Sequence, residues 1–144
     1  MMVVSIASDH AGYELKETLK NYFDSNGISC RDFGPEGTEA VDYPVYAKKV
    51  CASVQTGESE FGVLVCGTGI GMAIVANKHK NIRAACCHEA YSAKMARLHN
   101  DANVLTLGSR VVGAGLAVET VKQFLSTDFE GGRHSGRVDM INSL

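Results

Sequence analysis

The segment Cys66–Gly71, with the sequence CGTGIG, combines a thiol with closely spaced glycines. Glycines at alternate positions allow successive backbone N–H groups to point the same way, which forms an anion-binding loop where a helix begins. The partial positive charge at a helix N-terminus also favours a thiolate over a thiol. The segment therefore predicts an oxyanion-binding loop with Cys66 beside it as a base. Position alone leaves open that Cys66 is only the last buried residue of an apolar strand.

Three familiar phosphate-binding sequences do not match this loop. A dinucleotide-binding fingerprint requires a glycine at position 72 and a cysteine phosphatase requires an arginine there, but the residue is Met72. The Gly-Lys-Ser/Thr of a Walker loop is also absent. We therefore expect the loop to bind an oxyanion without belonging to any of these classes.

Two short polar segments are further candidates. Asp9 and His10 follow an apolar segment, and a carboxylate beside an imidazole suits hydroxyl binding or proton transfer. Asp9 is also suited to capping the next helix. His99 ends a helical segment, where a histidine is common because its positive form interacts favourably with the helix dipole.

Arginines near the C-terminus suggest phosphate binding. Arg133 and Arg137 are four residues apart and therefore neighbours on one face of a helix. Together with Arg110 they would form a phosphate clamp, because guanidinium groups match the geometry of phosphate oxygens. Taken alone, such a pair of arginines is more often a solvated helix face.

Neither a metal site nor a cofactor is predicted. His88 and His99 are eleven residues apart on one expected helix, which separates them by about 16 Å and prevents them from sharing an ion. The five cysteines are odd in number and include no CxxC, which argues against both a disulfide framework and a zinc ribbon.

Composition narrows the class of protein. The 144 residues fit a single domain over 1–144, and the net charge of -2 with no long run of one sign disfavours nucleic-acid or membrane partners. No cationic leader and no apolar stretch of about 18 residues is present, so we expect a cytoplasmic location.

Short β-branched segments alternate with amphipathic ones along the chain. This pattern predicts a three-layer α/β/α, Rossmann-like, doubly wound sheet of five parallel strands, with a C-terminal tail helix. The predicted strands are Met2–Ser8, Ile28–Phe33, Phe61–Cys66, Ile82–Cys87 and Asn103–Leu107. The predicted helices cover 12–25, 44–57, the segment after Gly71 through Asn77, 89–100, 112–125 and about 134–141.

Ligands of such sheets bind beyond the carboxyl ends of the strands. The residues expected there are Asp9-His10, Cys66–Gly71, His88-Glu89 and Gly108-Ser109-Arg110. The helix over 89–100 starts at this edge and runs about 16 Å away from it, so His99 is expected near the opposite edge, far from Cys66 of the same chain. If His99 is catalytic, it therefore serves a neighbouring subunit, which predicts an obligate homodimer with shared sites.

Six segments together resemble the ribose-5-phosphate isomerase B family, which includes the lactose-pathway galactose-6-phosphate isomerase subunits. The matching segments are Ser8–Gly12, Asp42–Pro44, Cys66–Gly71, His99-Asn100, Gly108–Arg110 and Arg133. The resemblance implies a metal-independent, cofactor-free interconversion of ribose 5-phosphate and ribulose 5-phosphate through an enediolate. It also implies a homodimer, sometimes paired into a tetramer, with sites at the subunit boundary.

The resemblance also implies roles for individual residues. It makes Cys66 the proton-transfer base and His99 the ring-opening group, while Asp9 and Thr68 hold substrate hydroxyls. The implied catalytic residues are thus Cys66, His99, Thr68 and Asp9. The implied substrate-binding residues are Asp9, His10, Gly67, Thr68, Gly69, Ile70, Gly71, Asn100, Arg110, Arg133 and Arg137, of which His10 and the three arginines bind phosphate.

Details of the match indicate one branch of the family. Another branch uses a glutamate base near the position of Met72, so this chain resembles the cysteine branch. The lactose-pathway proteins divide the catalytic residues between two subunits, whereas this chain carries all of them, which favours the pentose phosphate. The alternatives are allose 6-phosphate or galactose 6-phosphate as substrate, or a non-catalytic nucleotide- or phosphate-binding module.

Overall fold

The computed structural model describes residues 2–144 and contains one five-stranded sheet. The strands are β1 (Val3–Ser8), β2 (Ser29–Asp32), β3 (Phe61–Cys66), β4 (Ala84–Cys86) and β5 (Val104–Gly108). The helices are α1 (Tyr13–Ser25), α2 (Tyr43–Gln55), α3 (Ile70–Ala76), α4 (Ala90–Asn100), α5 (Ala114–Ser126), the short 3₁₀ helix η1 (Gly132–His134) and α6 (Ser135–Asn142).

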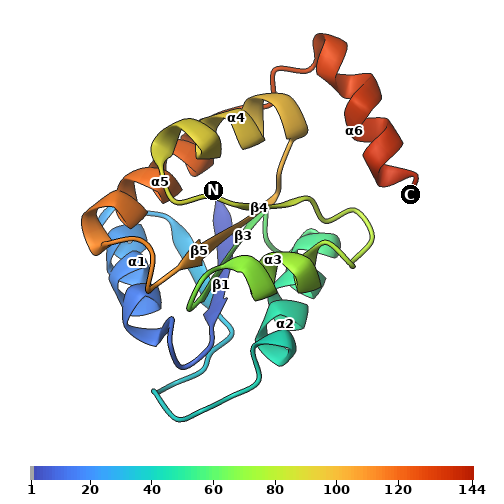
Figure 1. The fold of residues 1–144 in the computed structure, drawn as a ribbon. Coiled ribbons are helices and arrows are strands. Elements are labelled where there is room, and N and C mark those ends of the chain that lie inside the picture. Colours follow the sequence, from blue (N-terminus) through green and yellow to red (C-terminus); the bar gives the residue numbers. More distant parts are fainter. Residues whose placement is uncertain (1) are drawn as a thin grey trace.

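All neighbouring strands are parallel, in the order β2-β1-β3-β5-β4. Helices α1, α4 and α5 cover one face, and α2 and α3 cover the other (Figure 1). The predicted three-layer α/β/α fold is thereby confirmed. The chain adds β2 on one side of β1 and β3 on the other, so the order of strands reverses between β1 and β3, where such folds bind ligands.

The central strand β3 shows how the layers are held together. All six residues of its sequence FGVLVC are buried, because it has a strand on each side and a helical layer on each face. Its alternating side chains divide between two cores: Val63 and Val65 pack with α1, α4 and α5, whereas Leu64 and Cys66 pack with α2 and α3. The last side chain of β3 therefore points toward the α2–α3 layer.

The edge strand β4 is shorter than predicted. It pairs with β5 over only three residues, from Ala84 to Cys86. At its start, the Arg83 amide donates to the side chain of Asn103 rather than to a strand backbone. Ile82, predicted to begin the strand, lies buried in the α2–α3 core instead. The Arg83 carbonyl still accepts from the Asn103 amide at 3.0 Å, so a side-chain hydrogen bond and an apolar contact replace only part of the outer ladder.

Helix α6 confirms the predicted tail helix but stands apart from the three layers (Figure 1). Val138 is buried, while Met140 and Ile141 are exposed. A hydrogen bond of 2.8 Å from Arg83 Nη1 to Asn142 Oδ1 connects the helix to the segment before β4. Within residues 2–144, no helix combines the length and apolar character needed to cross a membrane.

A buried lysine anchors α1 to the end of β2. Lys16 is 0% exposed, and its Nζ donates to both carboxylate oxygens of Asp32 at 2.9 Å and to the carbonyl oxygen of Pro35 at 2.8 Å. Burial alone would raise the pKa of Asp32, but hydrogen bonds from Lys20 and Lys16 outweigh it and hold that pKa below its usual value. The lysine thereby fixes the loop that follows β2.

We predict that Lys16→Met lowers the free energy of unfolding by about 3 kcal/mol, because it leaves a half-buried carboxylate and a carbonyl without their buried donor. Lys20→Met is the matched control: this lysine also contacts Asp32, at 2.8 Å, but is 31% exposed. Its loss is expected to cost less than about 1 kcal/mol. Urea unfolding of both variants measures the difference, and equal costs would show that burial of Lys16 is unimportant.

Candidate active site

The thiol of Cys66 lies at the carboxyl end of β3, where the chain turns into α3. It is 5% exposed, and its Sγ accepts a hydrogen bond of 3.1 Å from the Gly69 amide. Gly69 precedes the first residue of α3 and has φ +78°, in the left-handed region that favours glycine. This backbone conformation turns an N–H of the helix start toward the sulfur, which favours negative charge there.

Hydrogen bonds from β5 and from the two residues that follow it hold the glycine loop in place. Thr106 Oγ1 donates to the Gly69 carbonyl at 2.8 Å. The Ser109 amide donates to the Cys66 carbonyl at 2.8 Å, and the Arg110 amide donates to the Gly67 carbonyl at 3.1 Å. The loop and the end of β5 therefore form one hydrogen-bonded unit.

The end of β1 lies beside this unit. The Asp9 amide donates to the Val65 carbonyl at 3.1 Å, and its buried carboxylate accepts from the Gly12 amide at 2.9 Å. His10 Nδ1 accepts from the Val41 amide at 3.2 Å, which leaves Nε2 as the nitrogen that carries the proton when the ring is neutral. The structure thus brings Asp9 and His10 to the same sheet edge as Cys66.

Tyr43, for which the sequence suggested no role, is a neighbour of the glycine loop. A Cβ built on Gly71 would lie 2.7 Å from ring carbons of Tyr43 and 2.8 Å from its hydroxyl oxygen. The ring therefore lies directly over the backbone of the glycine loop. The only sequence signal for this contact was the position of Tyr43 inside a matched segment.

The remaining predicted residues lie at the other end of the sheet. His99 is near the end of α4, and the chain then enters β5 through Asn103, whose carbonyl accepts from the Gly62 amide at the start of β3. Asn100 is at the same place, because its carbonyl accepts from Arg83 just before β4. The expectation that His99 lies far from Cys66 of the same chain is confirmed.

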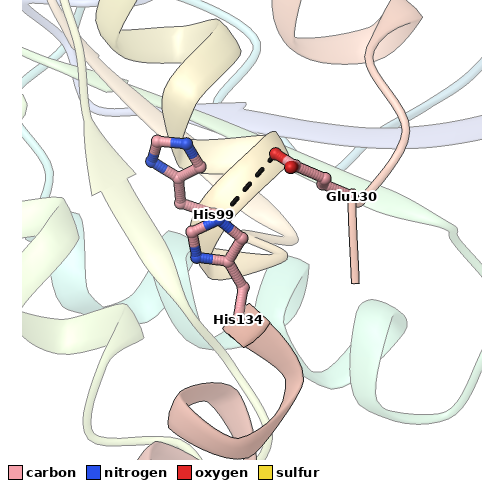
Figure 2. Close-up of side chains that lie close together, drawn as sticks. All are labelled: His99, Glu130 and His134. Carbon is pink, nitrogen blue, oxygen red and sulfur yellow. Dashed lines mark ion pairs between the residues drawn. The ribbon is translucent and has the colours of Figure 1, made fainter. Parts of the chain in front are cut away.

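His99 forms a cluster with two residues that the sequence analysis did not single out. Its ring stacks on that of His134, with centroids 4.4 Å apart and an interplanar angle of 19°. Glu130 Oε2 lies 3.8 Å from His134 Nε2 (Figure 2). Burial, and then the proximity of His99 and Arg133, lower the pKa of His134.

This cluster contains three potential metal ligands, with ligand atoms within 4.8 Å of one another. However, imidazole lone pairs lie in the ring plane, and the planes of His99 and His134 are stacked and nearly parallel. Both rings cannot point at one ion about 2 Å from each nitrogen without reorienting. The absence of a metal site therefore stays a prediction.

The arginines divide into two groups. Arg31, Arg83 and Arg97 each form an ion pair with a carboxylate. Within residues 2–144, no carboxylate lies within ion-pair distance of the other three, which are Arg110, Arg133 and Arg137. All three are exposed. The arginines predicted to bind phosphate are thus those with free guanidinium groups.

Comparison with known proteins identifies the family. The sequence profile described as Ribose/Galactose Isomerase matches residues 4–141. The chain belongs to this family. The resemblance to ribose-5-phosphate isomerase B inferred from six segments is therefore confirmed, and the chain is an isomerase by family.

Individual relatives match over nearly their full length. The ribose-5-phosphate isomerase B of Escherichia coli is 44% identical over 100% of this chain and 97% of its own. The D-erythrulose-4-phosphate isomerase of Pectobacterium atrosepticum is 41% identical over 98% of this chain and 93% of its own. The crystal structure of a ribose 5-phosphate isomerase from Thermotoga maritima has a TM-score of 0.98 and 50% identity, and the match covers 99% of each chain.

In this isomerase the contact between Gly108 and Thr68 controls the shape of the loop. A Cβ at Gly108 would lie 2.6 Å from the carbonyl carbon of Thr68 and 2.7 Å from its Cα. We predict that Gly108→Ala displaces the loop and lowers isomerase kcat/KM about 100-fold, because misplacement near 1 Å has that effect. Stability is expected to fall by about 1–3 kcal/mol.

Gly115→Ala is the matched control. Gly115 is in the first turn of α5, and a Cβ there meets nothing within 4 Å. Alanine in a helix is favoured over glycine, so this variant is expected to keep full activity and gain up to about 1 kcal/mol. Steady-state kinetics and urea unfolding test both variants, and full activity of Gly108→Ala would contradict the prediction.

Proposed function

We propose that the protein is a metal-independent aldose–ketose isomerase that interconverts ribose 5-phosphate and ribulose 5-phosphate. The observation that carries the proposal is the carboxyl-edge group of Cys66, the glycine loop and Arg110, held together by backbone hydrogen bonds. A nearly buried thiol that accepts an N–H from a helix start suits proton transfer, and a free guanidinium beside it suits the phosphate.

The reaction needs one carbon-bound proton moved and one charge stabilised. In the aldose-to-ketose direction, the Cys66 thiolate takes the proton from C2, and the bond electrons form the enediolate. The proton is then delivered to C1, while a hydroxyl proton passes from O2 to O1. Backbone N–H groups of Gly67–Gly71 stabilise the enediolate oxygen, a contribution worth about 3–4 kcal/mol for a single donor in other enzymes.

We assign ring opening to His99 of a second subunit. Asp9 and Thr68 hold the sugar hydroxyls from the subunit that contributes Cys66. Asn100, Arg133 and Arg137 accompany His99, since all four lie away from the carboxyl edge in one chain. His10 and Arg110 bind the phosphate from the first subunit, and the two tail arginines bind it from the second.

Exposed apolar side chains support association into a homodimer. Ile70 and Ile74 on α3 are 56% and 58% exposed and adjoin the glycine loop. Met140 and Ile141 are exposed on α6, which stands away from its own layers (Figure 1). Burial of such residues against a second copy is favourable by about 25 cal/mol per Å² of apolar surface.

We predict that Cys66→Ala lowers kcat for ribose 5-phosphate at least about 100-fold, because the base is lost. Turnover is measured in EDTA by the formation of ribulose 5-phosphate, with Cys30→Ala as the control, since Cys30 is a half-buried thiol away from the loop. Undiminished turnover by the Cys66 variant would remove it as the base.

The same assay separates the alternatives. Allose 6-phosphate, galactose 6-phosphate and D-erythrulose 4-phosphate are compared with the pentose, the last because a 41% identical relative is named for it. A higher kcat/KM for one of them would replace the proposed substrate but keep the isomerase. Binding of sugar phosphates without turnover of any would favour a non-catalytic phosphate-binding module.

Mixed dimers test the shared site. A random mixture of Cys66→Ala and His99→Ala subunits is expected to recover about a quarter of wild-type activity, because half of the dimers are mixed and each has one intact site. The double variant mixed with wild type is the control: both sites of its mixed dimers are incomplete, so mixing must lower activity. No recovery in verified mixed dimers would contradict site sharing.

A further inference from the structure

Strand β4 ends two residues before its neighbour β5 does. Strand β4 ends at Cys86, which pairs with Thr106 of β5. Just beyond it, the Cys87 amide donates a backbone hydrogen bond to the Thr106 carbonyl at 3.1 Å. Strand β5 continues for two residues to Gly108. Beyond Thr106, β5 therefore has no paired strand on its β4 side.

The side chain of His88 takes the place of the missing strand. Its Nε2 accepts a hydrogen bond from the Gly108 amide at 2.8 Å. Acceptance by Nε2 requires a neutral ring with its proton on Nδ1, because a protonated imidazole has no free lone pair. The bond is as short as a regular backbone hydrogen bond, so it caps the orphaned amide fully.

Gly108 is a junction between this cap and the site. Its backbone lies against that of Thr68, and the residues that follow it donate their amides to Cys66 and Gly67. The Gly108 carbonyl is also fixed, because it accepts from the Val111 and Val112 amides at 3.0 Å each. The imidazole therefore fixes the remaining polar group of this junction.

We propose that His88 is a positioning residue of the active site: it holds Gly108 in place, and through Gly108 the Thr68 backbone and the start of the Ser109-Arg110 segment. This proposal rests on the proposed function for its consequence in catalysis. Its structural half, the cap on Gly108, stands independently of any reaction. The sequence marked His88 only as a residue at a strand end.

The reach of the side chain supplies a matched pair of variants. A glutamine places its side-chain oxygen at about the distance of Nε2 from the backbone, whereas the oxygen of an asparagine reaches only about as far as Nδ1. His88→Gln therefore keeps an acceptor for the Gly108 amide. His88→Asn has the same amide chemistry without the reach.

The cap is observed directly by nuclear magnetic resonance. In protein labelled with ¹⁵N, the hydrogen bond produces a scalar coupling between the nitrogen of Gly108 and Nε2 of His88. Amide hydrogen exchange at Gly108 is expected to be at least about tenfold faster in His88→Asn than in His88→Gln, because an uncapped amide opens more readily. Absence of the coupling, or equal exchange in both variants, overturns the cap.

Kinetics test the positioning. We expect His88→Gln to retain kcat/KM within about threefold of wild type and His88→Asn to lose about tenfold or more, because the loop and Arg110 shift together. Equal activity of the two variants, with the exchange difference present, overturns the positioning role. If wild type turns over no sugar phosphate, the proposed function fails, and faster exchange at Ser109 and Arg110 in His88→Asn alone decides whether the segment is positioned.

Discussion

The structure depends most on the backbone hydrogen bonds that join the carboxyl ends of β3 and β5. Through them the Ser109 and Arg110 amides reach the Cys66 and Gly67 carbonyls. The bonds extend the ladder beyond the strands, so the thiol, the glycine loop and a free guanidinium share one rigid frame. Rigid placement matters because donors that are already oriented need not reorganise during a reaction.

A second constraint is the length of α4. This helix of 11 residues is about 16 Å long, begins near the carboxyl edge and ends near the opposite one, so it carries His99 away from the edge where Cys66 lies. No side-chain rotation closes that distance. A small domain with this topology can use both residues in one reaction only if two copies of the chain meet, which is why the proposed function requires a dimer.

Periodic patterns in the sequence predicted the layers well, because each depends on local spacing. The apolar run Phe61–Cys66 and the helical spacing before Asn26-Gly27 are examples. The predicted extent of β4 was too long because the end of a strand depends on its partner: side chains of Asn103 and His88 take over part of the backbone pairing near its two ends. No local pattern reveals such a replacement.

The places of the candidate site residues in the fold were predictable in part. Residues that follow strands could be placed at the carboxyl edge, and the position of His99 followed from helix length. The stacking of His134 on His99 and the contact of Tyr43 with Gly71 were not predictable, because each joins segments distant in sequence. Tertiary packing alone brings these pairs together.

The distribution of charge connects these features. The net charge of -2 suggests no attraction for an anion, yet three of the six arginines have no carboxylate partner among residues 2–144. Arg110 is at one edge, and Arg133 and Arg137 are near His99 at the other. Burial beside that second group lowers the pKa of His134, which disfavours a further positive charge there. In the proposed dimer, these two cationic groups would form a single phosphate site where one subunit's tail meets the other subunit's glycine loop.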